Sequence, residues 1–363
     1  MRKLPFYLKA MKSNNAERGT ITWQSPSNIA LVKYWGKHGN QLPRNPSLSM
    51  TLQASLTETA LSYQKRKEPG NGIGLTFAFE GKRNETFENR ITEYLNKLLP
   101  DYPFLADYHL QIDSGNTFPH SSGIASSASA FSALALCVVS LKNIVTDLQK
   151  ESEFYREASF LARLGSGSAC RSVYGGYTIW GEVDKVPGYS DEFAVPLRSE
   201  IHEVFQSFYD AVLIVSGEEK KVGSSAGHSL MERHPFAQSR FRQAHEHTAE
   251  LIKVLSTGDL ERYITIVENE ALTLHALMMS SSPGFMLMRK ETMEIIERIR
   301  DFRKTENIPV SFTLDAGPNV HLLYPGKYRK ETVKFIEDSL ADLCAERFWI
   351  DDAIGKGPEK IND

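Results

Sequence analysis

The first half of the chain alternates apolar and polar residues over short stretches, a pattern typical of half-buried β-strands. Gly, Pro or Asn residues separate the stretches, which are residues 20–24, 47–52, 57–64, 73–80 and 108–113. Apolar residues spaced three and four apart predict helices over residues 85–100, 126–142 and 151–165. We expect Gly165 to cap the last of these helices in a left-handed conformation, followed by a strand over residues 175–183.

The second half begins with a buried strand over residues 209–217 and continues with longer helical patterns. These predict helices over residues 235–255, 259–280, 286–304 and 330–344, with strands within residues 310–325 and 346–352. Strands and helices do not alternate strictly, so the order favours an α+β fold over a doubly wound one. We expect a loose extension over residues 1–18, an N-terminal α+β lobe over 19–200 and a C-terminal α+β lobe over 201–363.

The net charge and the cysteine spacing argue against several classes of partner and site. The 363 residues are 41% hydrophobic and carry a net charge of −3, which argues against a general nucleic-acid partner or an anionic membrane surface. The three cysteines form no CxxC pair, which argues against a disulfide framework or a zinc site. We find neither the apolar segment of a signal peptide nor a run long enough to span a membrane, and we expect a cytoplasmic protein.

The stretch "PHSSGIASSASAFSALALC" joins small polar residues to an apolar helix at Ser126 and Ser127, which are good N-terminal capping residues. A helix N-terminus presents unpaired N–H groups and a positive dipole end, so it attracts anions. The hydroxyls of Ser121 and Ser122 add donors, and Gly123 allows close approach of a ligand. The segment therefore predicts a phosphate-binding loop, with an ordinary capped core helix as the alternative.

Two further segments combine cations with hydroxyl groups. Lys33, Tyr34 and Lys37 lie in "NIALVKYWGK", and on an extended strand the two lysines would share one face and could hold a polyanion. The alternative is a strand whose lysines are solvated. "GSGSACRS" places Ser166 and Ser168 ahead of Arg171, which predicts a second anion-binding turn; a helix end followed by a surface arginine is the alternative.

A lone carboxylate, Asp315, ends an apolar strand just before Gly317 and Pro318. Such a residue is either a turn former or a catalytic group. Taken together, two anion sites, clustered lysines and one carboxylate indicate a phosphoryl donor, an anionic acceptor and a base between them.

These motifs, in this order, resemble the mevalonate diphosphate decarboxylases of the GHMP kinase superfamily. The resemblance spans about residues 20–350 and is carried by the segments "NIALVKYWGK", "SSGIASSASAFSALAL", "GSGSACRSVYGG" and "DAGPN". It implies a two-lobed α+β fold with the active site in the cleft between the lobes, and a homodimer. It also implies ATP-dependent, Mg2+-assisted conversion of 5-diphosphomevalonate to isopentenyl diphosphate, CO2, ADP and phosphate.

The resemblance assigns roles to residues. Asp315, Arg171 and Lys37 would be catalytic. The ATP phosphates would be held by Ser121, Ser122, Gly123, Ile124, Ala125, Ser126 and Ser127. The acidic substrate would be held by Asn28, Lys33, Tyr34, Lys37, Ser166, Ser168 and Arg171. No residue is assigned to the metal.

The chain departs from the family pattern near one motif. Ala226, Gly227 and His228 stand where many members have a charged residue, Gly and Met, so a monophosphate substrate stays open. The alternatives are therefore a 5-phosphomevalonate decarboxylase, a small-molecule kinase that stops at the phosphorylated intermediate, and a non-catalytic nucleotide-binding sensor. Release of ADP without CO2 would indicate the kinase, and release of neither the sensor.

Overall fold

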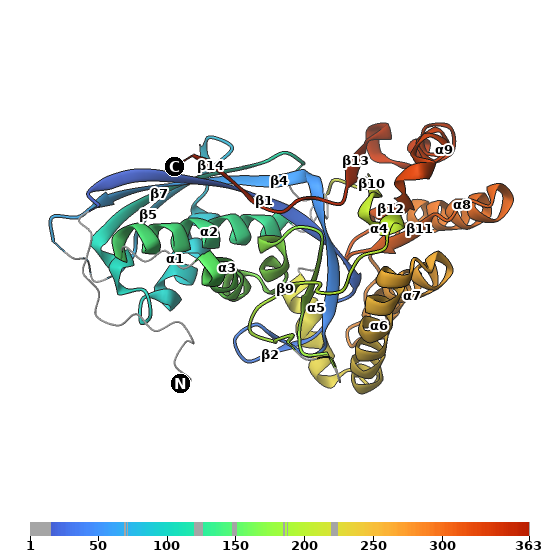
Figure 1. Cartoon of the computed structure of the whole chain (residues 1–363), viewed down its shortest axis with the longest axis horizontal. Helices are drawn as coiled ribbons and strands as arrows, with labels where there is room; N and C mark the ends of the chain where they lie inside the picture. The colour runs from blue at the N-terminus through green and yellow to red at the C-terminus, as the bar shows by residue number, and fades with distance from the viewer. Residues whose placement is uncertain are drawn as a thin grey trace.

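The computed structural model describes residues 16–68, 70, 72–119, 126–146, 151–183, 186, 188–218 and 224–362. Its first half is built on one large sheet, with strand order β14-β1-β4-β7-β5-β6 and with β8 and β9 continuing beside β4 (Figure 1). The elements of this half are β1 (Arg18–Val32), β2 (Lys37–His38), β3 (Leu42–Pro43), β4 (Ser47–Lys65), β5 (Gly74–Phe79), β6 (Lys82–Arg83), α1 (Glu85–Leu98), η1 (Pro103–Asp107), β7 (Tyr108–Asn116), α2 (Ser126–Thr146), α3 (Glu151–Gly165), η2 (Gly167–Val173), β8 (Tyr177–Trp180) and β9 (Val195–Pro196).

Helix α2 is the core of this half. It packs against β1, β4, α3 and η2, and most of its side chains are buried all round rather than on one face. It is long and apolar enough to cross a membrane by length and composition, contrary to our expectation that no such run exists, but 83% of its most apolar window is buried in the protein. Packing thus explains the apolar run that begins at Ser126.

The second half is built on an antiparallel sheet of order β11-β12-β10-β13. Helix α7 packs against β11 and α6, and α8 also packs against β11. The elements are α4 (Glu203–Gln206), β10 (Phe208–Leu213), α5 (Ser224–Leu230), η3 (Met231–Arg233), α6 (Ala237–Thr257), α7 (Leu260–Met279), α8 (Lys290–Glu306), β11 (Ser311–Leu314), β12 (Val320–Pro325), η4 (Gly326–Tyr328), α9 (Arg329–Phe335), η5 (Ile336–Leu340), η6 (Ala341–Leu343), η7 (Ala345–Arg347), β13 (Trp349–Ala353) and β14 (Glu359–Asn362).

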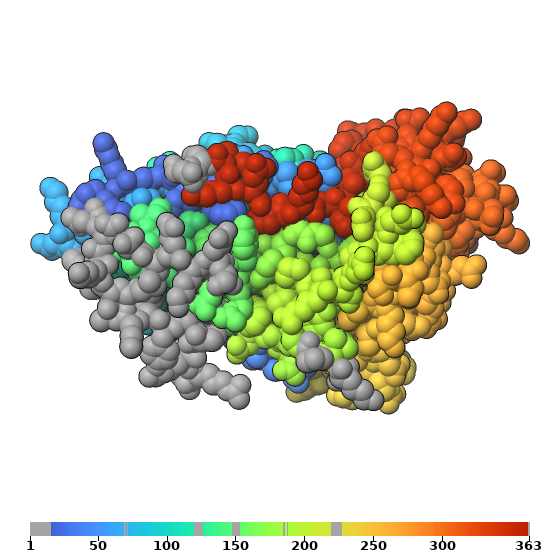
Figure 2. Space-filling model, viewed as in Figure 1, coloured from blue at the N-terminus to red at the C-terminus, as the bar shows by residue number. Residues whose placement is uncertain are grey.

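The two sheets are joined by apolar packing and by the C-terminal segment. One buried cluster contains Ile29 and Leu48 from the large sheet together with Val212 from the small sheet and Leu251 from α6. After β13, the chain crosses to the large sheet, where β14 pairs with β1 (Figure 2). The last residues therefore complete the sheet of the first half, and the expected division into lobes over residues 19–200 and 201–363 stays a prediction.

Asp352, at the end of β13, ties the small sheet to the middle of β4. Its buried carboxylate accepts hydrogen bonds from the backbone N–H groups of Gln53, Ala54 and Ser55, at 2.8, 2.7 and 2.9 Å. These three residues connect the two stretches that we expected to be separate strands, and the structure shows one strand of 19 residues instead. A carboxylate that satisfies three N–H donors explains how β4 stays continuous through this irregular region.

Asp352→Ala should lower the free energy of unfolding by about 3 kcal/mol, because it leaves buried backbone donors without an acceptor. Urea unfolding followed by circular dichroism measures the loss. Asp351→Ala is the matched control. The carboxylate of Asp351 is next in sequence, is partly exposed and pairs with Arg329 at the surface. Equal losses in the two variants would contradict the role given to Asp352.

The mixed α+β fold is confirmed, and most expected elements are present, but Gly165 does not have the role we expected. It is the last residue of α3 and not a left-handed cap. A Cβ atom at this position would lie 2.1 Å from the ring of Phe131. The glycine is therefore needed for close packing of α3 against α2.

Candidate active site

Lys33 lies just beyond the end of β1 and is almost completely buried, with 1% of its surface exposed. Its Nζ donates a hydrogen bond to the Ala30 carbonyl at 2.6 Å and lies 3.8 Å from Oδ1 of Asp315. Burial lowers the pKa of Lys33 to about 8, although the charges of Asp315 and Glu270 act in the opposite direction. A cation of this kind changes charge near neutral pH.

Asp315 follows β11 directly, as the sequence predicts, and begins a tight turn in which its carbonyl accepts the Gly317 N–H at 2.7 Å. Nε2 of His275, on α7, lies 3.1 Å from the same carbonyl oxygen. Because that oxygen only accepts, the proton must be on Nε2 of the ring. The Asp315 side chain is 32% exposed, so its carboxylate can meet a ligand while it faces Lys33.

Arg171 is buried in η2, and its guanidinium is held from two strands. Nε donates to Oδ1 of Asn28 at 3.2 Å, and Nη1 donates to the Ser47 hydroxyl at 2.7 Å. The Asn28 amide in turn donates to the Ser172 hydroxyl at 2.7 Å. Burial lowers the pKa of Arg171, and the charge of Asp315 acts against that effect. Arg171 thus belongs to the same electrostatic environment as Asp315 and Lys33.

Lys37 does not share an extended face with Lys33, so that expectation is wrong. Strand β1 ends at Val32, and Gly36 turns the chain with a φ of 101°. Lys37 then lies in the small β2–β3 hairpin and donates to Oε1 of Gln41 at 2.9 Å. Partial burial, followed by the charge of Arg90, lowers the pKa of Lys37.

Tyr34 packs between Trp180 and His228, with ring centroids 4.6 and 4.3 Å away. Its buried hydroxyl has no hydrogen-bond partner among the described residues, and burial raises its pKa. A Cβ atom on Gly167 would lie 2.9 Å from that hydroxyl, so the "GSGS" segment touches Tyr34 closely. A buried phenol of this kind is suited to a polar ligand.

His228 is a residue of this region whose contacts the sequence did not reveal. Nδ1 accepts the Gly36 N–H at 3.0 Å, and burial, followed by the charges of Lys37 and Arg171, lowers the His228 pKa to about 3. The ring is therefore neutral at physiological pH, with its proton on Nε2. The influence of Lys37 and Arg171 on His228 is visible only in the folded chain.

The two predicted anion sites meet. The hydroxyls of Ser127, at the start of α2, and Ser166, at the start of η2, are 3.3 Å apart. Ser126 begins α2, while Ser121, Ser122, Gly123, Ile124 and Ala125 lie outside the described residues. Half-buried Ser168 follows in η2, and its carbonyl accepts the Asn28 amide at 3.3 Å.

A cavity of about 210 Å³ opens beside the start of α2. Ser126 and Ser127 line it at one end, together with the aromatic rings of Phe77 and Phe87. Arg90 of α1 also lines it, and its guanidinium lies 5.0 Å from the centre of the Phe131 ring. No pattern in the sequence pointed to Arg90, because an arginine on a helix usually faces solvent.

No protein cage for a metal is present in the described ranges, where no group of three or more His, Cys, Asp or Glu side chains could hold an ion. Mg2+ at phosphate sites commonly keeps several waters and binds through substrate phosphates and one or two carboxylates. The partly exposed carboxylate of Asp315 and the hydroxyls of Ser126 and Ser127 are oxygen ligands that would suit an ion of that type, delivered with a nucleotide.

The chain is similar to known proteins over most of its length. The family model described as "Diphosphomevalonate decarboxylase-like N-terminal domain" matches residues 25–193, and "Mevalonate 5-diphosphate decarboxylase C-terminal domain" matches residues 211–353. The chain is 32% identical to the diphosphomevalonate decarboxylase of Ganoderma lucidum over 334 residues, which cover 87% of this chain and 80% of the relative.

Solved structures are also similar to this chain. The crystal structure of mevalonate diphosphate decarboxylase from Staphylococcus aureus is similar with a TM-score of 0.80 and 30% identity, covering 95% of this chain and 98% of the other. A structure of MDDEF in complex with MVAPP, AMPPCP and magnesium gives a TM-score of 0.79 and 28% identity, covering 95% and 100%. From the family models and the relatives together, the chain belongs to the diphosphomevalonate decarboxylase family.

Proposed function

We propose that the chain catalyses the ATP-dependent decarboxylation of 5-diphosphomevalonate to isopentenyl diphosphate, with release of ADP, phosphate and CO2. The observation that carries the proposal is the contact between Ser127 and Ser166, 3.3 Å apart. It supports the proposal because a nucleotide bound at the start of α2 and a substrate bound at η2 would be immediate neighbours, as phosphoryl transfer between two anions requires.

Asp315 is proposed to orient and deprotonate the C3 hydroxyl of the substrate, which then attacks the γ-phosphorus of ATP and releases ADP. Lys33 offsets charge on the moving phosphoryl group from its buried position, and Lys37 adds a second cation. Mg2+, when bound with ATP, neutralises phosphate charge. Phosphorylation converts a poor leaving group into a good one.

The second stage breaks two bonds. The C3–O bond cleaves and inorganic phosphate leaves, so that positive charge develops at C3, where the Asp315 carboxylate stabilises it. The bond between the substrate carboxylate and C2 then breaks, and its electron pair forms the new double bond as CO2 departs. Arg171, held by Asn28 and Ser47, is proposed to orient that carboxylate. Tyr34, Ser166 and Ser168 are proposed to bind the phosphate end of the substrate.

An assay of coupled ADP and CO2 release tests this function, with 5-diphosphomevalonate and 5-phosphomevalonate compared at equal concentration. We expect both products in equal amounts, and faster release from the diphosphate. Preference for the monophosphate would assign the related decarboxylase activity, and ADP without CO2 would assign a kinase. Release of neither product from either substrate would sink the proposal.

We also propose that the protein is a homodimer in the cytoplasm. Light scattering of the purified protein measures its number of subunits.

The value of kcat/KM should fall as pH rises above about 8. Lys33 has a lowered pKa of about 8, so it is a cation below that pH and loses its charge above it. Since the charged form is the one that stabilises the phosphoryl group, activity should follow the protonated fraction. A pH profile of ADP release from pH 6 to 10 measures the effect.

Lys33→Arg is the control for this profile, because a guanidinium stays charged throughout the range. Its alkaline limb should disappear even if its overall rate is lower. The same limb in Lys33→Arg as in the parent protein would assign the titration to another group.

A further inference from the structure

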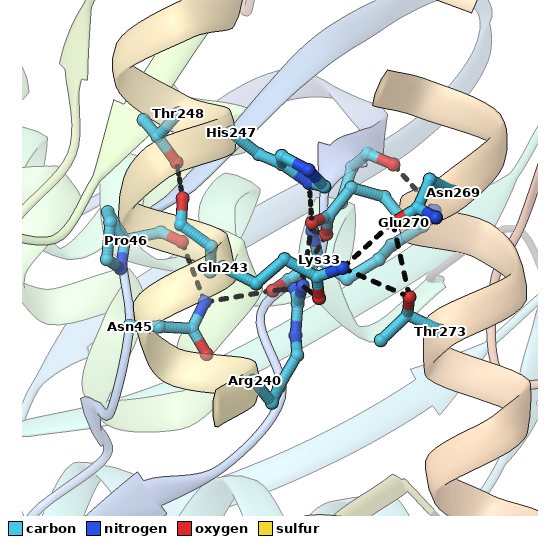
Figure 3. A network of polar contacts seen from close by, with 12 residues as sticks. Lys33, Asn45, Pro46, Arg240, Gln243, His247, Thr248, Asn269, Glu270 and Thr273 are labelled. Carbon is cyan, nitrogen blue, oxygen red and sulfur yellow. Dashed lines mark hydrogen bonds and ion pairs between the residues drawn. The ribbon is translucent and has the colours of Figure 1, made fainter. Parts of the chain in front are cut away.

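A buried ionic cluster connects α6 and α7 behind Lys33 (Figure 3). Both oxygens of Glu270 accept hydrogen bonds from Arg240, each at 2.6 Å, and Nδ1 of His247 lies 2.6 Å from Oε1 of Glu270. The Glu270 side chain is fully buried and that of Arg240 is 1% exposed. Burial alone would raise the pKa of Glu270, but Arg240 and His247 together lower it to about 2, so the carboxylate stays ionised.

The cluster holds the main chain of Lys33 from both sides. Oε2 of Glu270 accepts the Lys33 N–H at 2.8 Å, and Nη2 of Arg240 donates to the Lys33 carbonyl at 3.0 Å. Asn45 donates to the same carbonyl at 3.0 Å. Strand β1 ends one residue earlier, at Val32, so side chains of the two helices supply bonds that a strand would otherwise make.

Helix α7 also contacts Asp315, the carboxylate that faces Lys33. His275 lies five residues after Glu270 on α7, and its Nε2 is 3.1 Å from the carbonyl oxygen of Asp315. One rigid helix therefore contacts the main chain at both Lys33 and Asp315. Their charged groups approach to 3.8 Å, although they come from segments 282 residues apart in sequence.

We propose that α7 is a positioning element for the reaction centre, in which Glu270, with Arg240, holds Lys33 and His275 holds Asp315 so that the ammonium and the carboxylate keep a productive separation. The proposal rests on the proposed function for its kinetic consequence. Neither Glu270 nor His275 contacts substrate in this mechanism; both act through the residues that do.

The energetics distinguish positioning from simple stabilisation. Taking a carboxylate and a guanidinium out of water is costly, and an apolar pair of similar volume is often at least as stable. The Arg240–Glu270 pair is therefore weak evidence of stability by itself. Its bonds to the Lys33 peptide give it a function that an apolar pair cannot supply.

Glu270→Gln tests the proposal, with Glu268→Gln as the matched control. Glu268 lies on the same helix, is also buried, and pairs with Arg303 of α8 at 2.5 Å. For Glu270→Gln, we expect kcat to fall about 10- to 100-fold with little change in KM for ATP, because the reacting groups are displaced. Glu268→Gln should keep kcat within about threefold, since a change remote from the reacting groups mainly affects stability.

The double variant with Arg240→Met and Glu270→Leu removes both charges without leaving either one unpaired. We expect it to remain folded, with a lower melting temperature because the buried Lys33 N–H loses its acceptor, and to lose kcat as Glu270→Gln does. Parent-level kcat in a folded double variant would overturn the proposal. So would equal losses of kcat in Glu270→Gln and Glu268→Gln.

A second readout does not depend on turnover. Lys33 faces the charges of Asp315, Glu270, Arg171 and Asp210. Of these, the carboxylates of Asp315 and Glu270 raise its pKa most. In lysine-labelled protein, the Lys33 NMR signal, assigned by its absence in Lys33→Arg, should titrate at lower pH in Glu270→Gln and be unchanged in Glu268→Gln. If no substrate is turned over, the proposed function fails while this titration still tests the contact. An unshifted titration in Glu270→Gln would overturn the proposal.

Discussion

Asp315→Asn should lower turnover about 10³- to 10⁴-fold while ATP still binds, because asparagine has nearly the same shape but cannot accept the proton of the C3 hydroxyl. The Asp315 side chain is 32% exposed, and its Oδ1 atom lies 3.8 Å from Nζ of Lys33. The substitution therefore changes a group that a ligand can reach and that also pairs with Lys33. It also removes the charge expected to stabilise developing positive charge at C3. Single-turnover measurement of ADP and CO2, with calorimetry of ATP binding, records both effects.

The control for this variant is Asp301→Asn, an exposed aspartate on α8 that should keep parent turnover. Loss of ATP binding in Asp315→Asn would show that the carboxylate supports nucleotide binding and not proton transfer. Near-normal turnover would remove Asp315 from the mechanism altogether.

The arrangement explains why one chain can join phosphorylation to decarboxylation. The proposed nucleotide site at the start of α2 and the proposed substrate site at η2 touch through Ser127 and Ser166. Arg171 and Lys33 are buried cations near one partly exposed carboxylate, Asp315. Water is a poor competitor in such a site, so each charge acts more strongly than it would on the surface.

Local features of this site could be predicted from the sequence because local physics determines them. Helix α2 begins at Ser126, where the sequence predicts its start, and Asp315 directly follows an apolar strand before a Gly-Pro turn. Arg171 lies in η2 and is buried, so the alternative of a surface arginine is wrong, while its binding of an anion stays a prediction. In each case the signal lies within a few neighbouring residues.

Other features depend on contacts between distant segments. Whether Lys33 shares a face with Lys37 depends on where β1 ends, and the end of β1 is set partly by Glu270, 237 residues later. Likewise β4 is continuous because Asp352 binds its middle, and no local pattern around residue 53 shows this. A buried arginine such as Arg240 has the same sequence signature as a solvated one.

Arg171→Lys should lower kcat/KM for the acidic substrate about 100-fold while ATP binding is unchanged, because an ammonium cannot reproduce the planar fork of a guanidinium. In the folded protein Nε binds Asn28 and Nη1 binds Ser47, so the fork is held in one orientation. A lysine at this position keeps the positive charge but cannot reproduce both hydrogen bonds of the guanidinium. Buried oxygens of Asn28 and Ser47 would then lose their donor. Initial rates at varied substrate, with ADP and CO2 measured in the same reaction, give the effect.

The ratio of the two products distinguishes the proposed role from a general one. If Arg171 orients the carboxylate for loss of CO2, Arg171→Lys should release more ADP than CO2, since phosphorylation can proceed before decarboxylation fails. Arg298→Lys, on the partly exposed Arg298–Glu294 pair of α8, is the control and should keep equal release. Equal ADP and CO2 at a reduced rate in Arg171→Lys would restrict Arg171 to substrate binding, because the variant would then slow both stages together.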